Sequence, residues 1–187
     1  PMQQLISALQ EVLGPGGVLT GEAARSRSGS WGVMHCDAPA VLRPQSTQDV
    51  AAILRLCHAA GQPVVTEGGK TGLVSGARAS ASEIALSLER MHAIERLDAR
   101  GRTMTVQAGA TLQAVHEAAE AEGLVMPLDL GARGTATIGG NIATNAGGNQ
   151  VIRYGMMREQ VLGLEVVLAD GTVLSSLNQV LKNNTGY

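Results

Sequence analysis

Two glycine-rich segments constrain this chain more than any other feature. The first covers residues 66–76 and reads TEGGKTGLVSG, and the second covers residues 131–148 and reads GARGTATIGGNIATNAGG. Glycine lets the main chain approach a ligand closely and adopt positive φ, at an entropic cost on folding. A chain that bears this cost twice is expected to wrap backbone N–H groups around a polar, phosphate-bearing ligand.

Composition bounds the class of protein that can carry these segments. The chain has 187 residues, of which 44% are hydrophobic, enough for one globular domain or two small subdomains with a real core. It contains no Phe, one Trp and two Tyr, and its net charge is −2. These values argue against nucleic acid as a partner, because single strands are bound by aromatic stacking and duplexes by cationic surfaces.

Cysteine usage and hydropathy give two further expectations. Cys36 and Cys57 are too few for a disulfide framework, and Cys36 beside His35 has no second pair at metal-ligand spacing, so we expect no metal site. No apolar run reaches the ~18 residues of a membrane span, and the first residues carry no basic leader. We therefore expect a soluble, cytoplasmic protein without an integral membrane segment.

Hydrophobic spacing and capping signals predict an α/β first half with parallel strands. The predicted elements are a helix at 5–13, a loop at 20–38, a strand at 40–44, a helix from the capping box Ser46–Asp49 to Gly61, and strands at 63–66 and 84–88. The order strand, helix, strand predicts a βαβ unit with a parallel pair.

The second half is predicted to be mixed, with antiparallel pairs. Residues 94–97 and 103–107 predict one hairpin, and a helix follows from its capping residue Thr111 to Gly123. Residues 161–169 and 172–174 flank Asp170-Gly171, a two-residue hairpin signal.

The first glycine segment fits neither of the common nucleotide motifs. A Walker A loop requires glycine where Val64 stands, and the dinucleotide fingerprint fails because Leu19 occupies its third glycine position after Gly14 and Gly16. Two interpretations remain: a different phosphate cradle, in which the amides of residues 67–73 form a nest, or a plain tight turn after a strand.

The second glycine segment combines short polar side chains with apolar ones. Thr137, Asn141, Thr144 and Asn145 supply donors and acceptors suited to a flat heterocycle with carbonyls and ring nitrogens. The alternative is an irregular surface loop, but the segment is too apolar for one, because it also carries Ile138, Ile142, Ala143 and Ala146. We expect it to pack against something buried.

Four segments together resemble a known family. They are residues 63–73, 107–112 and 137–148, and the pair Arg153-Tyr154-Gly155 with residues 161–171. The chain resembles the FAD-binding domain of FAD-linked oxidases of the vanillyl-alcohol-oxidase or p-cresol-methylhydroxylase type over most of residues 38–187. The branch it resembles most is the D-2-hydroxyacid dehydrogenases, which include the glycolate oxidase flavin subunit, D-lactate dehydrogenase and D-2-hydroxyglutarate dehydrogenase.

The resemblance implies an α+β fold of the PCMH type, with a small parallel α/β subdomain followed by a mixed or antiparallel β subdomain with helices. It implies an N-terminal helix and loop at 1–37 and an FAD-binding domain at 38–187, divided into subdomains at about 38–100 and 101–187. Residues 182–187 carry no signal of a terminal element. We therefore expect a fragment with an incomplete FAD-binding domain and no substrate domain, which alone binds FAD poorly and turns over no substrate.

The resemblance also implies site residues. The first segment would cradle the FAD pyrophosphate with Glu67, Gly68, Gly69, Lys70, Thr71, Gly72 and Leu73. The flavin or ribityl region would be bordered by Pro127, Asp129 and Gly131. The isoalloxazine and ribityl–phosphate chain would be lined by Thr137, Gly140, Asn141, Thr144, Asn145 and Gly148. Glu67 stands where the family commonly has arginine, and Lys70 where it has glycine or asparagine, so Lys70 either balances phosphate charge or is an exposed side chain.

The expected chemistry is oxidation of a D-2-hydroxyacid, which loses its hydroxyl proton to a base and passes hydride to flavin N5. Relatives that tether FAD through histidine carry it in the first glycine loop, where this chain has Thr71, so we expect non-covalent FAD. No catalytic residue is assigned, because the histidines are scattered and none has a catalytic partner residue nearby in the sequence; they are His35, His58, His92 and His116.

The expected binding partners are a small 2-hydroxyacid and an electron acceptor of unknown type, and a homo-oligomer is left open. The alternatives are a non-catalytic flavin-binding subunit and a non-flavin nucleotide-binding module.

Overall fold

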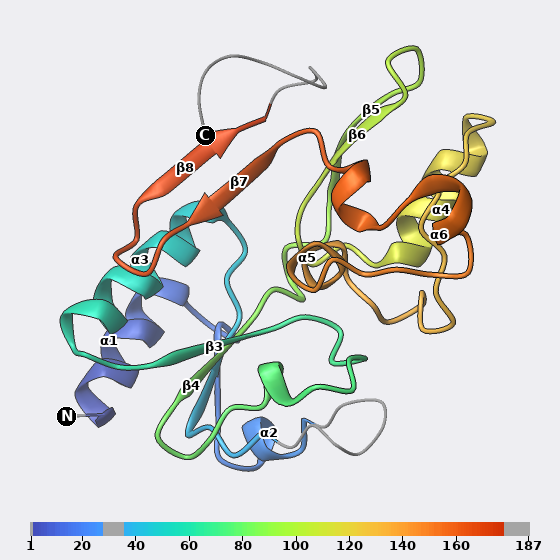
Figure 1. Ribbon diagram of the computed structural model, residues 1–187. Helices are drawn as coiled ribbons and strands as arrows, with labels where there is room; N and C mark the ends of the chain where they lie inside the picture. Colours follow the sequence, from blue (N-terminus) through green and yellow to red (C-terminus); the bar gives the residue numbers. More distant parts are fainter. Residues whose placement is uncertain (1, 28–35, 178–187) are drawn as a thin grey trace.

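The computed structural model of the chain describes residues 2–27 and 36–177 (Figure 1). A first lobe, residues 2–27 and 36–91, is built on a four-stranded sheet in the order β1-β2-β4-β3. Its strands are β1 (Val18–Thr20), β2 (Ala40–Leu42), β3 (Val64–Glu67) and β4 (Ile84–Ser87). Its helices are α1 (Met2–Leu13), α2 (Glu22–Arg25), α3 (Thr47–Ala59) and the short 3₁₀ helix η1 (Ser75–Ala77).

Both faces of this sheet are buried, because alternate side chains of a strand point to opposite sides. Leu42, Ile84 and Leu86 pack with α1 and α3 on one face. Val41 and Ala85 pack with Ala24, Cys36, Ala38 and Ala79 on the other. The near-continuous apolar runs of β2 and β4 are therefore typical of strands covered on both sides.

The parallel direction predicted for β2 and β3 is confirmed, but the two strands are not adjacent as the βαβ prediction implied. β4 lies between β2 and β3 and runs parallel to both, with Leu42 opposite Leu86 and Val65 opposite Ala85. The βαβ unit therefore spans one intervening strand instead of joining adjacent strands. β1 was not predicted as a strand; it pairs antiparallel with β2, and three residues are too few to show periodicity.

The second lobe, residues 92–163, packs short helices against an antiparallel hairpin around a core of Ala110, Leu112, Val115, Leu128, Ile138 and Met157. The hairpin joins β5 (Ile94–Asp98) to β6 (Thr103–Val106). The helices are α4 (Leu112–Ala121), α5 (Ile138–Ala143), α6 (Val151–Tyr154) and the 3₁₀ helix η2 (Met157–Gln160). The antiparallel hairpin and helices expected here are confirmed.

A last hairpin, β7 (Leu164–Val167) with β8 (Val173–Ser176), leaves the second lobe and lies back over α3 (Figure 1). Thr47 Oγ1 donates to Glu165 Oε1 at 2.6 Å and links α3 to β7. The hairpin is confirmed, but its turn is longer than predicted. Leu168 N–H donates to Thr172 O at 2.8 Å, so residues 169–171 form a three-residue loop with Gly171 at φ +84°.

The helix ends follow the predicted signals closely. Ser46 and Thr111 cap α3 and α4 by accepting from Asp49 N–H and Ala114 N–H. The predicted capping box would have the Asp49 carboxylate accept from the N–H of Ser46. The carboxylate accepts instead from the N–H of Gln45, one residue earlier, at 2.9 Å. Within the predicted loop at 20–38 the structure forms α2, and Trp31 and His35 lie outside the described residues.

Across residues 2–27 and 36–177, no helix is both long enough and apolar enough to span a membrane.

Candidate functional site

The two glycine-rich segments meet at the C-terminal end of β3. A β-carbon at Gly68 would lie 2.7 Å from Thr137 Oγ1, and one at Gly69 would overlap the carbonyl oxygen of Thr135. A side chain at position 69 would collide with the main chain of the second segment, and one at position 68 would press against the Thr137 side chain. The loop after β3 accordingly runs just below α5 in Figure 1. The structure therefore joins the two segments into one site.

The loop after β3 presents a run of free backbone donors. Within the part of the chain that the structure describes, the N–H groups of residues 68–73 donate to no protein acceptor. Lys70 in the middle of this run has φ +50°, and Gly68, Gly72 and Leu73 are exposed. Successive free amides around a residue in the left-handed region are the arrangement from which main-chain anion-binding nests are built, and such a nest suits a phosphate group.

The second segment begins with a capped helix whose position is fixed by main-chain bonds. Thr137 Oγ1 accepts from Gly140 N–H at 3.3 Å, and Gly139 N–H donates to Ala108 O at 2.8 Å. A β-carbon at Gly139 would lie 2.8 Å from that of Ala108. This close approach explains why α5 has glycine at position 139, although glycine disfavours a helix.

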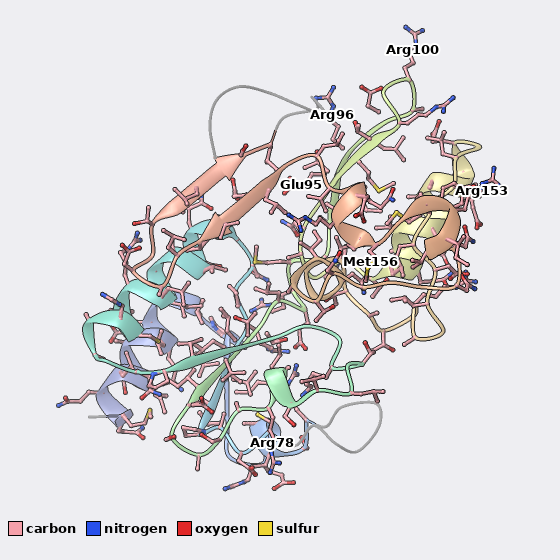
Figure 2. All side chains as sticks on the ribbon, viewed as in Figure 1. Arg78, Glu95, Arg96, Arg100, Arg153 and Met156 are labelled. Atoms are coloured by element: carbon pink, nitrogen blue, oxygen red, sulfur yellow. The ribbon has the colours of Figure 1, made fainter. Side chains whose placement is uncertain are left out.

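The polar side chains of α5 and the following loop divide into two groups. Asn141 is buried, and its Oδ1 has no hydrogen-bond partner among the residues that the structure describes, which leaves an acceptor free for a ligand. Thr144 Oγ1 donates to Gly140 O at 2.9 Å, and Asn145 Oδ1 accepts from Arg158 N–H at 2.9 Å. Met156, labelled beside α5 in Figure 2, also contacts Asn145, with its sulfur 3.8 Å from Nδ2. The side chains of Thr144 and Asn145 thus hold the loop together.

Residues 127–131 border the end of the second segment. A β-carbon at Gly148 would overlap the carbonyl oxygen of Asp129, and the Asp129 carboxylate pairs with Arg133 at 3.3 Å. Pro127 is half-buried and Gly131 is exposed. The ring of buried His116 lies on α4 with Nε2 2.8 Å from Leu128 O. His116 therefore has a structural role in fixing this segment, but the sequence does not reveal its partner, because nothing in the spacing links residues 116 and 128.

A buried charge network lies at the base of the first loop. Glu67 is 1% exposed, with Oε1 3.5 Å from Lys70 Nζ and Oε2 3.7 Å from Arg27 Nε. Glu89 accepts from Arg27 at 2.6 Å and from Arg43 at 3.1 Å. The Lys70 side chain is 8% exposed, so the interpretation of Lys70 as a solvated surface residue was wrong.

The electrostatics of Glu89 reflect these two arginines. Burial alone would raise the pKa of the Glu89 carboxyl, but hydrogen bonds from Arg27 and Arg43 and their charges hold it below its usual value. Arg27 was not identified as a site residue from the sequence, because nothing in the spacing links it to a carboxylate sixty-two positions later.

Other charged or potentially metal-binding residues lie apart from the contact between the two glycine segments. His58 and His92 are exposed, and residues 2–27 and 36–177 contain no cluster of three His, Cys, Asp or Glu side chains able to hold a metal ion. Arg100 extends from the tip of the β5–β6 hairpin and Arg96 from the middle of β5, both away from the lobe contact (Figure 2).

Comparison with known proteins identifies the family. A family model described as an FAD binding domain matches residues 38–176. The mitochondrial D-2-hydroxyglutarate dehydrogenase of Bos taurus is 45% identical over 184 residues, covering 97% of this chain and 34% of that protein. The D-2-hydroxyglutarate dehydrogenase of Xanthomonas citri pv. viticola is 51% identical over 148 residues, covering 79% of this chain and 31% of that protein. The chain thus spans about a third of the length of these relatives.

Solved structures share the fold at low sequence identity. An alkyldihydroxyacetonephosphate synthase superposes with a TM-score of 0.81 at 18% identity, covering 93% of this chain and 38% of the other. The 6-hydroxy-D-nicotine oxidase of Arthrobacter nicotinovorans superposes with a TM-score of 0.73 at 20% identity, covering 88% and 36%. Both likenesses bear out the expected α+β fold. The nest of free amides, the free Asn141 acceptor and the glycine contacts fit a dinucleotide, and the chain belongs to the family of FAD-binding domains, with FAD as its cofactor.

Proposed function

We propose that this chain is the FAD-binding part of a flavin-dependent dehydrogenase that oxidises a D-2-hydroxyacid. D-2-hydroxyglutarate is the first candidate substrate, ahead of glycolate and D-lactate. The support is the identity of 45% and 51% to two proteins named D-2-hydroxyglutarate dehydrogenase. The single structural observation behind the proposal is the contact of Gly68 and Gly69 with residues 135–140, which joins both glycine segments at one site.

The proposed roles follow from the hydrogen-bond donors and acceptors that each part of the site has available for a ligand. The N–H groups of residues 68–73 would bind the diphosphate, and residues 137–148 would line the flavin and the ribityl chain, with Asn141 Oδ1 as a buried acceptor. Residues 127–131 would border the same ligand, because Asp129 contacts Gly148. FAD would supply the redox chemistry when bound, and the protein residues would hold and orient it.

Attachment of FAD is proposed to be non-covalent. Thr71 occupies the position in the first loop where tethering relatives carry histidine, and residues 59–91 contain no histidine. Denaturing the full-length protein in acid should release all flavin into the supernatant. Recovery of a flavin-labelled peptide would overturn this part of the proposal.

The function is tested on the full-length protein, purified and examined for a flavin absorption spectrum. Each of D-2-hydroxyglutarate, L-2-hydroxyglutarate, D-lactate and glycolate is then supplied with a dye as electron acceptor. The proposal expects a yellow protein that reduces the dye with D-2-hydroxyglutarate and not with its L enantiomer. A yellow protein inactive with every hydroxyacid would favour a non-catalytic flavin-binding subunit, and a colourless protein that binds ATP but not FAD would overturn the proposal.

A cytoplasmic location is also a proposal. The Bos taurus relative is named mitochondrial and the Xanthomonas relative is not, so the relatives' names support neither location for this protein. Cell fractionation with an antibody against the full-length protein tests it.

A further inference from the structure

Charged atoms at the base of the first glycine loop are buried without hydrogen bonds. Both carboxylate oxygens of Glu67, Nζ of Lys70 and Nε of Arg27 are shielded from solvent and have no hydrogen-bond partner among residues 2–27 and 36–177. Their nearest opposite charges lie at 3.5 and 3.7 Å, beyond good hydrogen-bond distance. Lys70 also adopts φ +50°, a conformation that favours glycine.

Stability alone does not explain this arrangement. A buried ion pair regains the hydration it loses only where its geometry is good and its remaining donors and acceptors are bonded. The Lys70 ammonium has three donors, and none of them is bonded within the described part of the chain, although the side chain is only 8% exposed. An unsatisfied ammonium of this kind next to a run of free amides indicates a binding site for an anion.

We propose that Lys70 is an anion-binding residue of the diphosphate site, and that Glu67 and Arg27 are positioning residues that hold its ammonium group at the base of the loop. The inference rests on the proposed FAD site. The main chain of Lys70 lies within the run of free N–H groups, residues 68–73, and its ammonium has no acceptor among the described residues, so we expect a phosphate oxygen bound at this loop to supply one.

The role of Arg27 follows from the charges of the network. Arg27, Arg43 and Lys70 carry three positive charges against the two of Glu67 and Glu89, which leaves one net positive charge. Without Arg27, Glu67 would cancel the charge of Lys70. Burial alone would lower the pKa of Arg27, but the hydrogen bond and charge of Glu89 and the charge of Glu67 raise it, so Arg27 stays charged. Arg27 precedes residues 38–176, which the family model matches, and on this proposal it nevertheless contributes to the cofactor site.

The test measures FAD binding to the full-length apoprotein by flavin fluorescence over a series of NaCl concentrations. Lys70→Met is expected to weaken FAD binding about tenfold at low salt and to flatten the dependence of log Kd on log salt concentration. Lys70→Arg is expected to retain most of the salt dependence, because it keeps the charge. Arg27→Gln is expected to weaken binding in the same salt-dependent way.

The positioning role of Glu67 is tested by a double-mutant cycle. If Glu67 acts through Lys70, Glu67→Gln changes FAD affinity in the wild-type protein but has little further effect in Lys70→Met. Additive effects of the two substitutions would overturn the positioning role. Urea unfolding of each apoprotein verifies that the variants fold.

Arg78 offers a matched control in the same lobe. Its side chain is 51% exposed at the outer end of the lobe (Figure 2), and Arg78→Met removes the same charge without touching the network. This variant is expected to bind FAD as the wild-type protein does. Equal affinity and salt slope for wild-type, Lys70→Met and Arg78→Met would overturn the inference and leave the proposed function standing. A wild-type protein that binds no FAD would overturn the proposed function itself.

Discussion

Gly69 lies so close to Thr135 that any β-carbon at position 69 would overlap the Thr135 carbonyl oxygen. This contact joins the loop after β3 to the segment before α5, although sixty-six positions separate the two residues. The glycine at position 69 is therefore required by packing between two main chains, in addition to any contact with a ligand.

Replacing Gly69 tests this contact directly. Gly69→Ala is expected to lower the free energy of unfolding by about 1–3 kcal/mol, because a methyl group forced against a main chain shifts the backbone. Urea unfolding of the apoprotein measures the effect. Gly72→Ala is the matched control, since nothing lies within 4 Å of a β-carbon there, and it is expected to change stability by less than about 0.5 kcal/mol. Equal stabilities for the two variants would contradict the close approach.

His116 is expected to matter for stability and for the geometry of residues 127–131. His116→Ala leaves the buried Leu128 carbonyl without its partner and opens a small cavity, which is expected to cost about 1–3 kcal/mol. His92→Ala serves as the control, because His92 is exposed and its loss is expected to have almost no effect. Equal unfolding free energies for the two variants in thermal or urea unfolding would show that the hydrogen bond to Leu128 does not contribute to stability.

The Glu89 carboxylate predicts a specific pH dependence. Its pKa is lower in the folded protein than in the unfolded chain, where a glutamate titrates near 4.3. Its contribution to stability is thus fully present above that value and is lost as the pH falls through the folded pKa. The difference in unfolding free energy between the wild-type protein and Glu89→Gln should therefore shrink between pH 6 and pH 3. A difference that stays constant over this range would mean that the two arginines do not stabilise the charged form.

The two cysteines are expected to be unreactive in the folded protein. Cys57 is 1% exposed and burial raises the pKa of its thiol to about 11, so almost none is thiolate at neutral pH. Burial also raises the pKa of the Cys36 thiol. Alkylation with iodoacetamide at pH 8, mapped by mass spectrometry, should label both positions only after urea is added. Rapid labelling of Cys57 in the native protein would contradict its place in the core against α1 and β4.

Local signals in the sequence were sufficient for much of the fold. Ser46 and Thr111 identified the starts of α3 and α4, and Gly61 and Gly123 adopt the positive φ expected where those helices end. These signals act within a few residues of one another, so they can be found without knowledge of tertiary contacts.

The parts that could not be predicted depend on distant contacts. α5 contains two adjacent glycines and has poor helix propensity; it forms because Thr137 caps it and Ile138 packs in the core of the second lobe. The position of β4 between β2 and β3 and the pairing of Arg27 with Glu67 likewise depend on tertiary structure. The sequence located the glycine segments, whereas only the structure revealed the charged network at their base.

Hydrogen–deuterium exchange of the full-length protein, with and without FAD, tests the central claim most directly. The N–H groups of residues 68–73 have no acceptor among residues 2–27 and 36–177, so they should exchange rapidly without FAD and become protected when FAD binds, together with residues 137–148. Protection of both segments at one FAD per chain is the predicted result. Bound FAD that leaves the exchange of both segments unchanged would contradict the claim that they hold the cofactor.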